Sequence, residues 1–201
     1  MRALVTGGAK RLGREISVYL ANRGYDVAVH YNSSKNEALD VAKEINSQGR
    51  LSECLKCDLL IEDQVKALVP LASEALGGPI SMLVNNASIF EHDSFDDATR
   101  ASWDRHMESN LRAPFVLTQA FSKQSPSPIL DKKNEPISQG LVLYMIDQRV
   151  KKLTPDFASY TIAKMGLWAM TQTAARALAP NIRVNAIGPG PVSYTHLRAH
   201  E

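Results

Sequence analysis

Tyr160 and Lys164, four residues apart, are the side chains of this sequence whose spacing most directly suggests proton chemistry. On a helix they would lie on the same face, with Cβ atoms about 5–6 Å apart. A free tyrosine has a pKa of about 10 and transfers protons poorly at neutral pH, whereas a nearby ammonium favours the tyrosinate form. The pair alone also fits an ordinary exposed helix face, so its weight depends on the polar residues that accompany it.

Apolar strand-like segments alternate with helical segments along the chain, and these elements must position the pair. Strands are expected at residues 3–5, 27–30, 51–57, 80–84, 141–146 and 182–187, and helices at 11–23, 36–48, 62–76, 100–123 and 156–179. This alternation predicts a doubly wound α/β fold with a parallel sheet, because right-handed crossovers place helices on both faces. Residues 124–139 contain three prolines and no periodicity, so we expect a surface loop there.

The composition fits one domain that acts on a small molecule. Of 201 residues, 44% are hydrophobic and 22% are charged, which allows one core and a polar surface. The net charge of +2 is mixed along the chain, so no nucleic-acid or membrane partner is indicated. No membrane span and no signal peptide are evident, and a cytoplasmic protein is expected. Cys54 and Cys57, in or beside a strand, are expected to be ordinary thiols.

A glycine-rich turn, Thr6 to Gly13, directly follows the first expected strand and opens the first expected helix. Such a turn aims backbone N–H groups and the positive end of a helix at a ligand, and glycine lets a phosphate approach the backbone. Ordinary turn chemistry would also account for the glycines if they stood alone. Their place between a strand and a helix indicates a dinucleotide site.

The charges around this turn favour NADP(H) over NAD(H). Sites for NAD usually carry an acidic residue at the end of the second strand, which would repel a 2′-phosphate. The corresponding residues here are polar and uncharged: Tyr31, Asn32, Ser33 and Ser34. Lys10 and Arg11 in the turn could reach the same phosphate, although they would also suit a solvated loop.

With these residues assembled, the chain resembles the short-chain dehydrogenase/reductase superfamily from about Ala3 to Pro191, and within it the pteridine reductase and dihydromonapterin reductase group. The motifs occur in the expected order: Thr6–Gly13, Asp58, Asn85–Ser88, Asn110, Tyr160 with Lys164, Arg183–Asn185 and Gly188–Pro191. The resemblance implies a Rossmann-type fold of three layers, α/β/α. It also implies that the cofactor is bound by Gly7, Lys10, Arg11, Leu12, Gly13, Tyr31, Asn32, Ser33, Ser34, Asp58, Leu59, Asn86, Ala87, Ser88, Tyr160, Lys164, Pro189 and Gly190.

Two departures from the superfamily pattern also occur in pteridine reductases. Arg11 replaces the middle glycine of the turn, and in that group it is associated with the 2′-phosphate. Asp147 replaces the catalytic serine thirteen residues before the tyrosine, and in that group the aspartate works with the tyrosine in supplying protons. The resemblance also implies that Asn110 holds a water linking the site to solvent. Phe90 matches an aromatic residue that stacks on the pterin ring, although a core phenylalanine is an equal alternative.

Together the residues predict an NADP-dependent oxidoreductase that transfers hydride to a C=O or C=N carbon, with Asn110, Asp147, Tyr160 and Lys164 as its catalytic residues. A pterin is the expected small-molecule substrate, and Phe90 and Asp147 are expected to bind it. A carbonyl or 3-oxoacyl reductase with another small substrate stays open, as does a truncated, inactive dinucleotide-binding module. Similar reductases pair through the helices expected at 100–123 and 156–179, so a homodimer or homotetramer is expected.

The end of the chain departs from the family pattern. Residues 192–201 do not resemble it, and we interpret them as a non-native tail after a single domain of residues 1–191. That domain would lack the last strand and helix of the family. His196 and His200 have the spacing of metal ligands on a helix, but no third ligand stands near, so no metal site is expected.

Overall fold

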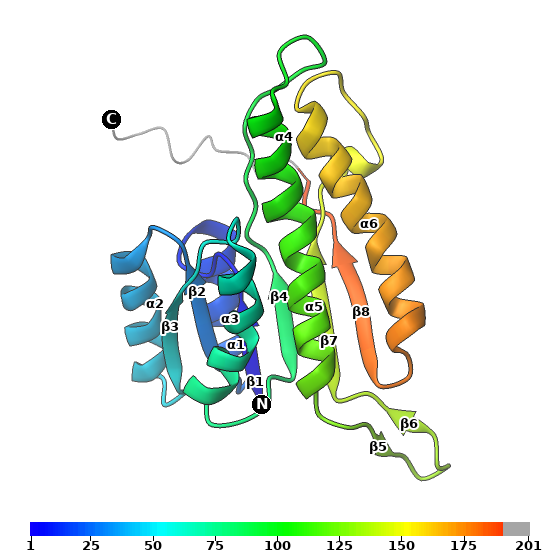
Figure 1. Cartoon of the computed structure of the whole chain (residues 1–201). Coiled ribbons are helices and arrows are strands. Elements are labelled where there is room, and N and C mark those ends of the chain that lie inside the picture. The colour runs from blue at the N-terminus through cyan, green and yellow to red at the C-terminus, as the bar shows by residue number, and fades with distance from the viewer. Residues whose placement is uncertain (191–201) are drawn as a thin grey trace.

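The computed structural model describes residues 1–190, which form a parallel sheet with helices on both faces (Figure 1). The strands of this sheet are β1 (Arg2–Val5), β2 (Asp26–Tyr31), β3 (Ser52–Lys56), β4 (Met82–Asn85), β7 (Gly140–Met145) and β8 (Ile182–Ile187). The helices are α1 (Arg11–Asn22), α2 (Lys35–Ser47), α3 (Glu62–Ala75), α4 (Arg100–Met107), α5 (Ala113–Gln124) and α6 (Ala158–Leu178). The predicted doubly wound α/β fold is confirmed.

The inner strands β1, β2 and β4 are buried on both faces, which explains their mostly apolar sequences, whereas the edge strands β3 and β8 include exposed polar residues. Successive side chains of a strand point to opposite faces. Ala3 and Val5 therefore join the core beneath α1 and α2, which includes Ile45. Leu4, between them, joins the other core, where α3, α5 and α6 cover the sheet and Leu117 is fully buried.

The helix expected over residues 100–123 is interrupted. It begins at a capping box, in which Thr99 Oγ1 accepts the N–H of Ser102 (3.1 Å) and Ser102 Oγ accepts the N–H of Thr99 (3.0 Å). After α4, a π-helical turn, η1 (Glu108–Arg112), precedes α5. A π-turn inserts one extra residue and shifts the side chains that follow, and such turns are frequent at functional sites. Here Ser109 and Asn110 are buried in the turn.

Residues 124–139 lie at the surface, as expected of a loop, and they contain a small antiparallel hairpin that was not predicted, β5 (Ile129–Leu130) paired with β6 (Pro136–Ile137). Asp131 closes the hairpin, because its Oδ1 accepts the N–H groups of Lys133 (2.7 Å) and Glu135 (2.9 Å). The hairpin projects from the end of the sheet where β7 begins (Figure 1). It is therefore remote from the carboxyl ends of the strands.

The order of the strands, β3-β2-β1-β4-β7-β8, predicts where a ligand would bind. From β1 the chain builds outward through β2 to β3, and from β4 it builds in the other direction through β7 to β8. In open α/β sheets, ligands bind outside the carboxyl ends of the strands where this direction changes. That place lies between the loops that follow β1 and β4.

Two absences concern the described part of the chain. Among residues 1–190, no helix is long and apolar enough to cross a membrane, and no group of three or more His, Cys, Asp or Glu side chains is arranged to hold a metal ion. The expected tail at 192–201, with His196 and His200, lies outside the described residues.

Candidate active site

The glycine-rich turn at the end of β1 requires glycine at two of its positions, one for its backbone conformation and one for lack of space. Gly7 has a positive φ of 61°, which glycine adopts without strain. A Cβ atom on Gly13 would lie 2.0 Å from the carbonyl oxygen of Gly7 and 2.6 Å from Nδ2 of Asn86. Arg11, which stands where the superfamily has glycine, keeps a left-handed backbone with a φ of 50°. The turn therefore retains a glycine-like shape while it gains a cation.

The loop after β4 holds this turn in place. Nδ2 of Asn86 donates to the carbonyl oxygens of Thr6 (3.0 Å) and Gly7 (3.2 Å). In return, Oγ1 of Thr6 accepts the N–H groups of Asn86 (2.9 Å) and Ala87 (3.0 Å). Asn86 and Ala87, predicted from the sequence as cofactor-binding residues, thus use these groups to fix the turn.

His30, which was not among the predicted site residues, holds the turn by a hydrogen bond from the second strand. Its Nδ1 accepts the N–H of Gly7 at 2.9 Å, so its Nε2 carries the proton and donates to the carbonyl of Cys57 at 3.0 Å. Burial lowers the pKa of His30 to about 4, because the charged ring would lose its hydration. The only signal in the sequence was a polar residue within an apolar strand.

The other predicted cofactor-binding residues lie at the carboxyl ends of the strands. Asn32, Ser33 and Ser34 lie between β2 and α2, Asp58 and Leu59 follow β3, Ser88 follows β4, Pro189 and Gly190 follow β8, and Leu12 lies in the first turn of α1. Asp58 Oδ1 accepts the N–H of Leu60 at 3.0 Å, which fixes the loop after β3. Tyr31, the last residue of β2, packs in the core beneath α1 and α2.

A carboxylate stands closer to the turn than the sequence suggested. Nζ of Lys10 lies 2.6 Å from Oε1 of Glu37, in the first turn of α2. This ion pair holds the pKa of Glu37 below its ordinary value. Glu37 lies just beyond the uncharged segment 31–34, and it compensates the charge of Lys10.

Three of the four predicted catalytic residues, Asp147, Tyr160 and Lys164, come together where β7 ends and α6 begins. The Tyr160 hydroxyl donates to Oδ2 of Asp147 at 2.8 Å, and Oδ1 of Asp147 accepts the N–H of Arg149 at 2.8 Å. Arg149 belongs to a short 3-10 helix, η2 (Gln148–Val150), which Asp147 caps. Nζ of Lys164 donates to the carbonyl of Met145 at 2.8 Å and lies 5.6 Å from the centre of the Tyr160 ring. Tyr160 and Lys164 are both buried.

The acidity of Tyr160 differs from the sequence-based expectation. Burial is the largest cause that raises the pKa of Tyr160, and the charge and hydrogen bond of Asp147 raise it further. Burial lowers the pKa of Lys164 to about 8, against the opposing charge of Asp147. The expectation that Lys164 favours tyrosinate is therefore wrong for the protein without ligands, in which Tyr160 is a protonated phenol.

The side chain of Asn110 forms two hydrogen bonds with the loop after β4. Its Oδ1 accepts the N–H of Ile89 and its Nδ2 donates to the carbonyl of Ile89, both at 2.8 Å. The π-turn places this buried side chain against the loop. Asn110 therefore positions the residue directly before Phe90, while its predicted role in holding water stays a prediction.

Phe90 lies at the open side of the site and is 54% exposed, so the alternative of a core phenylalanine is wrong. Its ring stacks on Phe157 with the centroids 4.2 Å apart and an interplanar angle of 7°. It also meets the edge of Tyr160, at 4.7 Å between the centroids. Phe157, which no sequence pattern singled out, precedes α6 with a left-handed φ of 60°. The Arg149 guanidinium lies 4.7 Å from the centre of the Phe157 ring.

Comparison with known proteins identifies the family. The model of a family described as short chain dehydrogenase matches residues 1–201, which is the whole chain. The chain therefore belongs to the short-chain dehydrogenase family and is an oxidoreductase, as the sequence motifs predicted.

Three similar proteins show what this chain resembles. The 3-oxoacyl-[acyl-carrier-protein] reductase FabG of Staphylococcus aureus is 33% identical over 189 residues, covering 94% of this chain and 73% of the relative. The crystal structure of FolM alternative dihydrofolate reductase 1 from Brucella suis in complex with NADP is 45% identical, with a TM-score of 0.85, and the match covers 95% of this chain and 75% of that one. A short chain dehydrogenase from Burkholderia cenocepacia, also in complex with NADP, is 32% identical with a TM-score of 0.85, over 94% and 73% of the two chains. These complexes agree with the cofactor expected from the sequence.

The buried His30 predicts that stability depends on pH. The pKa of His30 is about 4 in the folded protein and about 6.5 when unfolded, so the unfolded chain binds more protons between these values. Stability should therefore be fully present above about pH 6.5 and fall as the pH drops towards about 4. Between about pH 7.5 and about pH 5 we expect a loss of about 2 kcal/mol from His30, measurable by urea unfolding.

His30→Gln should reduce this pH dependence, to which the buried His106 also contributes, even if the variant is less stable at neutral pH. His92→Gln, which changes an exposed histidine, is the matched control and should keep the parental slope. Equal slopes for the parent and His30→Gln would show that His30 does not titrate as described.

Proposed function

We propose that this chain is an NADPH-dependent reductase that reduces a C=O or C=N bond in a flat, amino-substituted heterocycle such as a pterin. The observation that carries the proposal is the hydrogen bond from the buried Tyr160 hydroxyl to Asp147, beside the exposed ring of Phe90. The similarity to a dihydrofolate reductase crystallised with NADP supports it. A cytoplasmic location belongs to the proposal, and the free thiols of Cys54 and Cys57 fit that reducing compartment.

The turn after β1 fits a dinucleotide. Its backbone opens at the N-terminus of α1, and the close contacts of Gly13 show that no larger residue would preserve it. We assign the 2′-phosphate to Arg11 and Lys10, with hydroxyl and amide groups from residues 32–34. The bound cofactor would supply hydride from its nicotinamide, and the chain's own residues would supply the proton.

Tyr160 serves as the acid. Its phenol is protonated at neutral pH, as it is at any pKa at or above the ordinary value of about 10, so a proton is available when hydride transfer leaves an anion on the substrate oxygen or nitrogen. Once Tyr160 has given up that proton, the nearby Lys164 ammonium stabilises the tyrosinate. Reprotonation from solvent returns the phenol to its starting state.

The carboxylate of Asp147 and the ring of Phe90 define the substrate class. A carboxylate accepts two parallel N–H bonds from an amino-pyrimidine, as it does from arginine. The ring of Phe90 is stacked on Phe157 on one side, and the residue is 54% exposed, so we assign its other face to the flat substrate ring. A serine at position 147 would suit simple carbonyl substrates, and the 33% identity to a 3-oxoacyl reductase makes such a reductase the second candidate.

Two substitutions separate these functions. Tyr160→Phe should abolish turnover of a dihydropterin with NADPH, while NADPH binding persists, because only the acidic proton is removed. Asp147→Ser should lose pterin reduction and keep any activity on small carbonyl substrates. The oxidation of NADPH measures turnover of the dihydropterin and of the carbonyl substrates for both variants. If Asp147→Ser reduces pterins as well as the parent does, the pteridine assignment fails and the carbonyl reductase replaces it.

Cofactor preference tests the charges at the turn. We expect NADPH to bind more tightly than NADH, and Arg11→Ala should weaken NADPH binding alone, by about tenfold or more. Glu37→Gln should tighten NADPH binding roughly two- to threefold, because it frees Lys10 and removes a nearby negative charge.

Fluorescence titration measures these affinities, and Glu15→Gln is the matched control, since Glu15 pairs with Arg14 and not with Lys10. Equal affinities of the parent for NADPH and NADH would contradict the assignment of Arg11.

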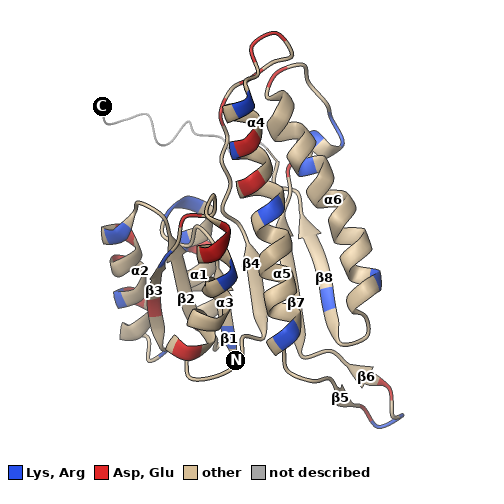
Figure 2. Cartoon of the chain, in the orientation of Figure 1, with Lys and Arg blue, Asp and Glu red and all other residues tan. Residues whose placement is uncertain are grey.

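We also propose that α5 and α6 pair with the same helices of a second copy. The sequence of α6 holds only two charged residues, Lys164 and Arg176, and Figure 2 shows the helix almost free of charge. A groove of about 240 Å³ between α5 and α6 includes Phe115 and Met170 in its lining. Such an apolar groove suits the packing of another helix.

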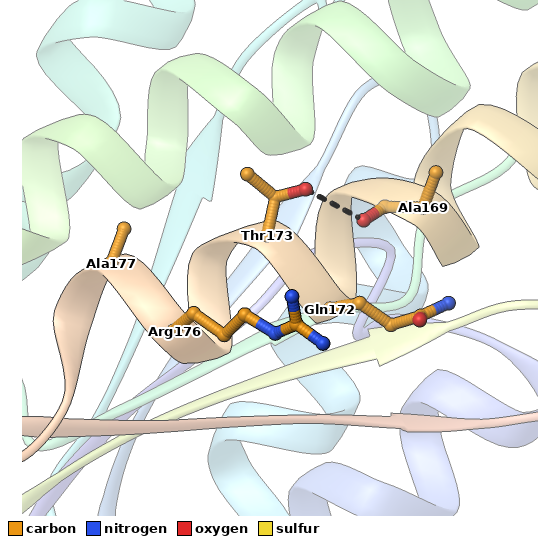
Figure 3. A pocket seen from close by; sticks show the side chains of 5 residues that line it. All are labelled: Ala169, Gln172, Thr173, Arg176 and Ala177. Atoms are coloured by element: carbon orange, nitrogen blue, oxygen red, sulfur yellow. Dashed lines mark hydrogen bonds between the residues drawn. The ribbon is translucent and has the colours of Figure 1, made fainter.

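A second hollow extends this face along the last turns of α6. Figure 3 shows its lining residues, Ala169, Gln172, Thr173, Arg176 and Ala177. Thr173 turns its hydroxyl back onto the carbonyl of Ala169 at 3.1 Å, so this hydroxyl is satisfied within the helix, while Gln172 and Arg176 give the hollow a polar edge. Tyr160 lies in the first turn of the same helix, so this hollow is not the catalytic site.

Light scattering tests the interface. The parent should have at least the dimer mass at micromolar concentration, and Phe115→Glu should shift it towards the monomer, because a charge would be buried in the groove. Leu130→Glu, which changes an exposed leucine of the β5–β6 hairpin, is the control and should keep the parental mass. A monomeric parent would contradict the interface.

A further inference from the structure

Three buried polar side chains near Tyr160 are linked in one chain of hydrogen bonds, and the ring of His106 lies 6.0 Å from the ring of Tyr160, centroid to centroid. Asp93, His106 and Ser159 are each at most 2% exposed. Nδ1 of His106 lies 2.6 Å from Oγ of Ser159, and that hydroxyl is also hydrogen-bonded to Oδ2 of Asp93. Oδ1 of Asp93 accepts the N–H of Ser159 at 3.2 Å. None of these side chains belongs to the catalytic or cofactor-binding set.

The directions of these bonds follow from one backbone donor. The N–H of Glu91 donates to Nε2 of His106 at 3.1 Å, so Nε2 carries no proton. The proton of the neutral ring is then on Nδ1 and is donated to Ser159, whose own hydroxyl proton goes to the Asp93 carboxylate. Burial lowers the pKa of His106 and keeps this neutral form.

One end of this chain caps the helix that carries Tyr160 and Lys164. Phe157 precedes α6 and has no polar side-chain atom with which to cap it. The N–H groups of Ala158 and Ser159 instead donate to the backbone carbonyl and the carboxylate of Asp93, both at 3.2 Å. A carboxylate satisfies free N–H groups there and interacts favourably with the helix dipole.

The other end fixes the backbone around Phe90. Ile89, on one side, is held at its N–H and its carbonyl by Asn110. Glu91, on the other side, is held at its N–H by His106, and its carboxylate pairs with Arg105 at 2.7 Å. The residues that hold Phe90 are thus connected, through His106, to the helix end that holds Tyr160.

We infer that Asp93, Ser159 and His106 are positioning residues that set the Tyr160 hydroxyl against the ring of Phe90. This inference deepens the proposed function and rests on it, because it assumes that Phe90 receives the substrate ring and that Tyr160 gives it a proton. The three residues touch neither reacting group directly through a polar atom. Their effect passes through the loop at residues 89–93 and the first turn of α6.

Ser159→Ala tests the inference, because it removes the central hydroxyl and leaves the backbone N–H that Asp93 accepts. We expect amide hydrogen exchange in residues 89–93 to become faster by about tenfold, and kcat/KM for a dihydropterin to fall by about tenfold, while the Kd for NADPH is unchanged. Ser159→Thr, which keeps the hydroxyl, should recover most of both losses.

Ser73→Ala is the matched control, since it also removes one hydroxyl bond, to Gln124 at 2.9 Å, far from the site. Unchanged exchange in residues 89–93 of Ser159→Ala, or the same changes in Ser73→Ala, would overturn the inference. A parent protein that does not reduce pterins would overturn the proposed function instead, and exchange would still decide whether this chain of bonds holds the loop.

Discussion

The hydrogen bond from Tyr160 to Asp147 is the interaction on which the proposed chemistry depends. It joins residues thirteen positions apart, one placed by the end of β7 and the other by the first turn of α6. Lys164 ties the same two elements together by donating to the carbonyl of Met145, the last residue of β7. The sheet, the helix and the acid are thus fixed by one small set of contacts, and a shift of α6 would separate them.

Burial has the largest effect on the pKa values of Tyr160 and Lys164. Removing a phenol and an ammonium from water disfavours tyrosinate and the charged lysine alike, which explains why the pKa of Tyr160 rises and that of Lys164 falls. A buried ammonium is costly unless it is paired, and the Met145 carbonyl with the charge of Asp147 offsets part of that cost. The Tyr160 phenol is therefore protonated, and it can give its proton to an anion that forms on the substrate.

Local sequence patterns predicted the strands, the helices and the grouping of the catalytic residues. Apolar alternation and the turn at Gly7–Gly13 are short-range features, and parallel strands bring their carboxyl ends to one edge. The remaining features depend on long-range contacts that no spacing reveals. Asp93 and Ser159 are 66 residues apart, and Lys10 meets Glu37 only because α1 and α2 lie on the same face of the sheet. The π-turn at Asn110 is different, because Pro114 follows it at the start of α5, lacks a backbone N–H and is a local signal that a helix over residues 100–123 is interrupted.

The most direct test of the account is the ionisation of Tyr160 in the protein without ligands. The near-ultraviolet absorbance of tyrosinate, taken as the difference between the parent and Tyr160→Phe during a pH titration, isolates this residue from Tyr144, whose pKa burial raises to about 12. The account predicts that Tyr160 ionises above the ordinary tyrosine pKa of about 10, and that Asp147→Asn lowers that value by removing the carboxylate. Ionisation of Tyr160 below about pH 10 in the parent, or no change in Asp147→Asn, would contradict it.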